Sequence, residues 1–191
     1  MTQPVHKDRR NAGDQPLEFT LTEDALIWRT EDGEWGGDMP FDTVREVRLT
    51  VETAGGGSQV VCRVTDMAGR EAVFGSMRWI GAGRWESAAD TFQILLRGLH
   101  ASLLPHAQTI RFVEGRSVAF RTAIFLSGAI LTAIGAIFFV LLFLMRENPF
   151  GLLLVAPVAA GIWLMRLCWP RAPAPYDPQA YAEPPAPLDG D

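Results

Sequence analysis

Cysteine and metal-ligand clusters are scarce in this chain of 191 residues. The two cysteines, Cys62 and Cys168, lack CxxC partners, so the sequence predicts neither a disulfide framework nor a zinc site. None of the three histidines has a Cys, His or carboxylate at metal-ligand spacing, and no acid/base or nucleophile constellation stands out. We therefore expect a protein that is not an enzyme and binds no metal or cofactor.

A basic surface and an N-terminal apolar run are missing as well. Sixteen of the 17 basic residues are Arg, the formal charge is −5, and residues 1–116 carry 13 Lys or Arg against 17 Asp or Glu. This balance excludes a strongly basic face, so we expect no nucleic-acid partner. Residues 1–16 are mostly polar and contain no apolar run, which predicts a flexible, disordered tail and no secretory signal peptide.

Two long apolar runs dominate the second half of the chain. Residues 122–145 carry no charge and would form a helix of about 36 Å, longer than the roughly 30 Å hydrocarbon core of a bilayer. Residues 150–169 reach about 30 Å if Arg166 extends its side chain to the interface. Because helices without a polar face are rare in soluble cores, we predict a transmembrane hairpin with an external loop at residues 146–149, rather than a buried globular hairpin.

The basic residues near the two runs predict the orientation of this hairpin. Five Arg residues flank its open end, whereas only Arg146 lies in the loop. The positive-inside rule therefore places both termini in the cytoplasm and the connecting loop outside. Arg121, Arg166 and Trp169 are the predicted interfacial residues. The five flanking residues are Arg111, Arg116, Arg121, Arg166 and Arg171.

Small residues recur every four positions in the first run, at Gly128, Thr132 and Ala136. This spacing lets helix backbones approach closely. Packing within the hairpin is the favoured interpretation, and a face between copies of the chain is the alternative.

Before the apolar runs, residues 17–76 read as short strands with alternating apolar positions. An amphipathic helix follows, with an approximate capping box at Ser87 and Asp90 and a stop at Pro105. A strand-like stretch at 109–113 comes next. The pattern predicts an α+β domain in which antiparallel strands form a barrel or sandwich covered by one helix. The apolar stripe of that helix consists of Phe92, Leu95, Leu96, Leu99 and Leu103.

This layout resembles the bacterial PH-like (pleckstrin-homology-like) membrane proteins of uncharacterised function. The resemblance covers about residues 17–114 and rests on LEFTLTEDALIWR, MPFDTVREVRL, VVCRVTD, REAVFGS and FQILLRGLHASLL. It implies a partly open, strongly bent antiparallel β-barrel of about seven strands, capped by the helix and joined by a linker at 115–121 to the hairpin. It also implies that the hairpin lies in a bacterial inner membrane. Phosphoinositide-binding PH domains place Lys and Arg around their first turn, but here Glu23 and Asp24 occupy it, so headgroup binding there is not expected.

The loop at residues 76–86, SMRWIGAGRWE, is the candidate binding site. It carries Arg78, Trp79, Arg84 and Trp85 around a glycine hinge. Trp and Arg together are typical anchors of protein interfaces and also suit the headgroup layer of a membrane. The alternative is structural, with both Trp side chains folded over the open end of the barrel.

Residues 170–191 contain seven prolines and predict an extended, disordered tail that either docks on a cytoplasmic partner or only solubilises the chain. The favoured function is a non-enzymatic, membrane-anchored interaction module that binds a protein partner at the cytoplasmic face. Alternatives are a lipid or small-ligand sensor at the inner leaflet and an accessory subunit of a membrane enzyme or transporter. A homo-oligomer is also a possible assembly.

Overall fold

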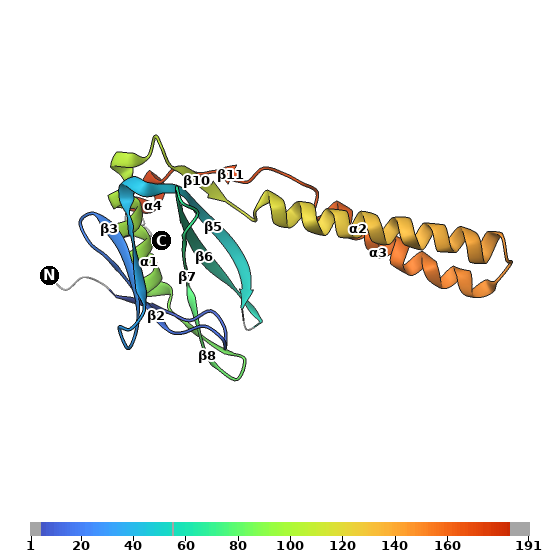
Figure 1. Cartoon of the computed structure of the whole chain (residues 1–191), viewed down its shortest axis with the longest axis horizontal. Coiled ribbons are helices and arrows are strands. Elements are labelled where there is room, and N and C mark those ends of the chain that lie inside the picture. Colours follow the sequence, from blue (N-terminus) through green and yellow to red (C-terminus); the bar gives the residue numbers. More distant parts are fainter. Residues whose placement is uncertain (1–4, 55, 184–191) are drawn as a thin grey trace, which may run out of the picture. The chain divides into compact units, whose positions relative to one another are not determined.

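The computed structural model describes residues 5–54 and 56–183 (Figure 1). The chain divides into two compact units. The first, called the domain below, combines Met1–Gly115 with Ala174–Asp191, and the second, called the hairpin, is Arg116–Pro173. The domain is therefore built from both ends of the chain, with the hairpin inserted between them.

The first sheet of the domain has the strand order β1-β2-β3-β4 and is antiparallel throughout. Its strands are β1 (His6–Asp8), β2 (Leu17–Leu21), β3 (Ala25–Thr30) and β4 (Gly36–Pro40). The short strands expected here are found in β2 and β3, which form an antiparallel hairpin in which Phe19 pairs with Trp28. Leu26, Trp28 and Thr30 alternate toward the core, as a half-buried strand requires.

The second sheet has the order β11-β10-β5-β6-β7. Its strands are β5 (Val44–Ala54), β6 (Gly57–Asp66), β7 (Glu71–Gly75), β10 (Arg111–Glu114) and β11 (Ala174–Pro175). All neighbours are antiparallel except β10 and β5, which are parallel. The mixed α+β class with antiparallel sheets is confirmed. The strands form separate sheets in the described part of the chain and no closed barrel there, so the expected partly open, PH-like barrel stays a prediction.

Helix α1 (Ala89–Leu103) covers the core between the two sheets. All five residues of its predicted apolar stripe are buried, which confirms the amphipathic helix. The expected capping box does not form, because Ala88 occupies the N-cap position and has no side chain that can accept a hydrogen bond. Pro105 lies in the 3₁₀ turn that follows, Leu104–His106.

Both predicted tails contribute to the domain, contrary to the sequence-based expectation. Within residues 1–16, strand β1 pairs with β2 and buries His6 and Asp8. Within residues 170–191, β11 pairs with β10, and the helix α4 (Gln179–Ala182) follows it. Tyr176 and Tyr181 pack against the core, which gives this proline-rich segment apolar area to bury. Residues 1–4 and 184–191 of the two predicted tails lie outside the described residues.

The hairpin consists of two helices long and apolar enough to cross a membrane, by length and composition. The first spans Val118–Leu144, with α2 (Val118–Phe139) continuing into a π-helical turn, Val140–Leu144. The second spans Pro149–Leu167, with a 3₁₀ segment, Pro149–Leu154, leading into α3 (Val155–Leu167). Only 11% of each apolar window is buried, unlike the core helix of a soluble protein. The first helix begins at Val118 because Ser117 caps it by accepting a hydrogen bond from the Phe120 backbone N–H.

Glycines bring the two hairpin helices into close contact. A Cβ atom on Gly128 would lie 2.8 Å from the carbonyl oxygen of Gly161, and one on Gly135 would lie 2.8 Å from a methyl group of Val158. Packing within the hairpin, the favoured interpretation of the small-residue spacing, is therefore confirmed for Gly128. Ala136, the last residue of that series, is exposed on the outer surface of the hairpin.

Candidate functional site

The predicted binding loop is a β-hairpin and not an irregular loop. Strands β8 (Met77–Gly81) and β9 (Arg84–Ser87) form their own two-stranded sheet, and Trp79 pairs with Trp85 across it. The turn needs positive φ at Gly81 (111°), Ala82 (48°) and Gly83 (71°), so the glycines permit its shape. The alternating side chains of SMRWI and RWES are consistent with two strands that our loop interpretation overlooked.

Two of the four predicted site residues are held by contacts inside the domain. The Trp79 backbone N–H donates to the Arg9 carbonyl oxygen at 2.8 Å, and the Arg9 guanidinium lies 4.6 Å from the centroid of the Trp79 ring. Arg78 forms an ion pair with Glu86 across the β8–β9 hairpin at 2.6 Å. Trp79 thus covers the N-terminal segment rather than the mouth of a barrel, and this contact holds the β8–β9 hairpin in place.

Three other residues of the two strands remain available. Ile80 is 44% exposed, Arg84 is exposed, and Trp85 is half-buried. Arg84 has no ion-pair partner within residues 5–54 and 56–183. We call Ile80, Arg84 and Trp85 the β8–β9 tip. This surface offers an aliphatic group, a free guanidinium and an indole to a ligand.

Buried polar residues of β1 support the N-terminal segment beneath Trp79. The Asp8 carboxylate accepts a hydrogen bond from the Gly75 backbone N–H at 2.8 Å, and His6 Nδ1 lies 2.9 Å from Thr91 Oγ1. Burial raises the pKa of Asp8 to about 6 and lowers the pKa of His6 to about 4. Sequence reasoning missed both residues because a strand of His, Lys and Asp carries no apolar signal.

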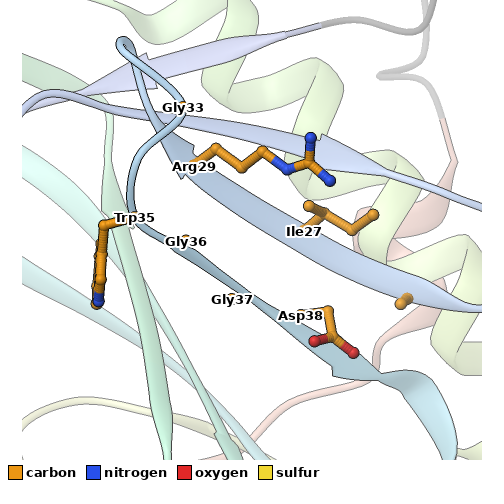
Figure 2. Close-up of a pocket in the computed structure, with 8 residues that line it drawn as sticks. Ile27, Arg29, Gly33, Trp35, Gly36, Gly37 and Asp38 are labelled. Atoms are coloured by element: carbon orange, nitrogen blue, oxygen red, sulfur yellow. The ribbon is translucent and has the colours of Figure 1, made fainter.

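A second surface lies on the outer face of β3 and β4. An open groove there is lined chiefly by Ile27, Arg29, Trp35, Gly36 and Asp38. Figure 2 shows Arg29 and Ile27 along β3 and Asp38 on β4, with Trp35 near the turn that joins the strands. Trp35 is 58% exposed. An aromatic residue before two glycines was the available signal in the sequence, and the sequence analysis did not use it.

His100 anchors the returning C-terminal segment. Its Nδ1–H donates to the Leu96 carbonyl oxygen at 2.8 Å, which leaves Nε2 to accept from the Tyr176 hydroxyl, also at 2.8 Å. Burial lowers the pKa of His100, so the ring stays neutral and keeps this arrangement. The Tyr181 hydroxyl donates to Glu114 at 2.6 Å, and its ring stacks on His100. This cluster has a structural role in holding the chain end.

The predicted interfacial residues of the hairpin lie at its open end. Arg121 is in the first turns of α2, Arg166 is in the last turn of α3, and Trp169 follows that helix. The Trp169 ring packs edge-on against Phe125 of α2, with the centroids 5.5 Å apart. The arrangement gathers two Arg side chains and one indole at the same end, as an interfacial belt requires.

The described residues contain no group of three or more His, Cys, Asp or Glu that could hold a metal ion. No family model, curated protein or solved structure matches the chain. The function must therefore be argued from the surfaces themselves.

Proposed function

We propose that this protein is a non-enzymatic interaction module with a PH-like domain, anchored in the bacterial inner membrane by its apolar hairpin. In this proposal the domain faces the cytoplasm and binds a partner protein through the β8–β9 tip. The observation that carries this proposal is the exposure of Ile80 and Arg84 beside Trp85. These residues lie on the β8–β9 hairpin, which the contact between Trp79 and Arg9 fixes to the N-terminal segment. A pre-organised surface of this composition is typical of protein-binding hot spots.

The charge of the domain favours a protein partner over a lipid surface. Met1–Gly115 and Ala174–Asp191 together carry 12 Lys or Arg and 21 Asp or Glu, a net charge of −9, whereas the hairpin carries +4. An acidic domain is repelled by the anionic lipids of a cytoplasmic leaflet, and one Arg at the tip offsets little of this repulsion. Partner proteins with a basic or mixed surface have no such barrier.

The cytoplasmic orientation rests on the distribution of arginines around the hairpin. Arg116 and Arg121 precede or begin the first helix, and Arg166 and Arg171 end or follow the second, whereas the connecting loop has Arg146 alone. The positive-inside rule assigns the Arg-rich end to the cytoplasm.

Site-specific photo-crosslinking of the full chain in native membranes tests the proposal. A benzophenone amino acid at Ile80 should give a discrete protein adduct, and the adduct should disappear in the Arg84→Ala variant. The matched control places the same probe at Met67, which is 63% exposed in the β6–β7 turn and should give no adduct. Adducts to lipid at position 80 would instead support the lipid-sensing alternative, and the absence of any adduct there would reject both.

A further inference from the structure

Strand β4 is an open edge of the first sheet. It pairs with β3 on one side only, at the end of the order β1-β2-β3-β4. The Thr30 N–H donates to the Trp35 carbonyl and the Phe41 N–H to the Asp24 carbonyl, so the odd-numbered residues of β4 bond toward β3. In an antiparallel ladder the intervening residues point the other way. The main-chain N–H and C=O groups of Gly36 and Asp38 therefore face outward from the sheet and are free to pair with another strand.

The glycines of β4 leave this edge bare on both faces. A Cβ on Gly37 would lie 2.5 Å from the Trp28 ring, which packs beneath it. A Cβ on Gly36 would lie 2.6 Å from the Trp28 carbonyl oxygen and 2.9 Å from Arg29 Cγ, because the main chain of β3 and the stem of Arg29 already lie against this position. A side chain at residue 36 would displace Arg29. Only the stem of Arg29 lies against Gly36, because its guanidinium extends along β3 beside Ile27 rather than across β4 (Figure 2).

Arg29 and Asp38 are exposed on the same face and lack ion-pair partners in the described part of the chain. They sit on neighbouring strands but in different rows, since Arg29 pairs with Gly36 and Asp38 pairs with Ile27. Each charge has its opposite nearby without meeting it. The complementary charge that each needs is present on a second copy of the same surface.

We propose that β4 pairs antiparallel with β4 of a second copy of this chain, joining the two four-stranded sheets across a two-fold axis at Gly37. Gly36 then lies opposite Asp38 of the second copy, and these two residues exchange both main-chain hydrogen bonds. The two-fold axis repeats the pair, so four hydrogen bonds form. The row across the joined sheets becomes Arg29, Gly36 and Asp38 of the second copy. Arg29, whose stem already lies against Gly36, reaches that carboxylate by turning its guanidinium over the glycine, across two strand spacings of roughly 10 Å in all.

The charges also select this register over its neighbours. A two-fold axis at Asp38 would place the two Asp38 residues opposite each other, and an axis at Gly36 would place Asp38 opposite Glu34. Both alternatives bring like charges together, which destabilises a strand pair. Confinement of both copies to one membrane by their hairpins raises their effective concentration, so a short interface suffices.

Charge reversal in full-length protein reconstituted into lipid vesicles tests the pairing, with differently tagged copies and co-purification as the readout. Wild-type copies should associate, and association should fall at least tenfold in R29D alone and in D38R alone. A mixture of R29D with D38R should restore it, because every contact between these two variants is again complementary. The matched control, Arg45→Asp, makes the same change at an exposed site on β5 and should associate like the wild type.

Wild-type copies that do not associate would overturn the proposal, as would a mixture no better than each variant alone. An extended peptide from another protein as the true occupant would appear as the first of these outcomes. Equal thermal unfolding midpoints among the variants, read from Trp fluorescence, would show that they remain folded. The β8–β9 tip takes no part in the β4 surface. Failure of the association experiment therefore leaves the proposed function standing, and failure of the crosslinking experiment leaves the β4 pairing standing.

Discussion

Removing the Tyr176 side chain tests how firmly the C-terminal segment is tied to the domain. Tyr176 is half-buried, packs against Phe112 and His100, and donates its hydroxyl to His100 Nε2 at 2.8 Å. Tyr176→Phe removes that bond and leaves a buried nitrogen unpartnered, which should cost about 1.5 kcal/mol. Tyr176→Ala also loses the ring packing, so we expect about 3 kcal/mol.

The thiol of Cys62 reports the opening of the domain in the full-length protein. Cys62 is fully buried in the same core, and burial raises its pKa, so it reacts with a maleimide only when the domain opens. The other cysteine is removed by Cys168→Ser. Because 1.4 kcal/mol corresponds to a factor of ten, labelling should accelerate about tenfold in Tyr176→Phe and more than a hundredfold in Tyr176→Ala. The urea midpoint, followed by Trp fluorescence, should fall in the same order.

The control for this experiment is Tyr181→Phe. Its hydroxyl bond to Glu114 is exposed, so losing it should change the labelling rate less than about threefold. If Tyr176→Ala left both the labelling rate and the urea midpoint unchanged, the C-terminal segment would lie outside the cooperative core, and the reasoning from burial would be wrong.

Two further variants test the other buried contacts. Burial lowers the pKa of His6 to about 4, so its contribution to stability is lost as the pH falls below 6.5; burial raises the pKa of Asp8 to about 6, so its protonation opposes that loss. Between pH 6.5 and 4, Asp8→Asn should therefore lose about 2 kcal/mol more stability than the wild type by urea unfolding; equal pH profiles would contradict this. In the hairpin, Gly161→Val should cost about 2 kcal/mol by thermal unfolding in detergent, because a Cβ there would lie 2.6 Å from the Gly128 carbonyl oxygen; the exposed Ala160→Val is the control, and equal midpoints would refute close packing.

Strong periodicity made part of the fold predictable. The alternation of Val47, Leu49 and Val51 indicated a strand, and β5 is found there. The period of 3.6 in the stripe from Phe92 to Leu103 indicated a helix with one buried face, and α1 has it. Barrel closure could not be derived in this way, because periodicity specifies which face of a strand is buried but not which strands become neighbours.

The missed elements share a weak local signal and depend on distant partners. Strand β1 has the sequence His-Lys-Asp, and it is ordered because Asp8 meets the Gly75 N–H and His6 meets Thr91. The C-terminal segment is rich in proline, a composition that favours a disordered tail. Its distinguishing feature is that it holds both tyrosines of the chain, and the partner that buries them, His100, lies 76 residues earlier.

The pairing of β10 with β11 changes the order in which the protein can be completed. Glu114, the last residue of β10, pairs with Ala174, the first of β11, so the chain leaves and re-enters the domain at adjacent positions. The sequence pattern predicted a domain at residues 17–114, which lies entirely before the apolar helices. Instead, Tyr176 and α4 reach the core only after both apolar helices have been synthesised, because they follow them in the chain. His100 and Phe112 must therefore remain uncovered while the hairpin is being made, and docking of the C-terminal segment completes the domain last.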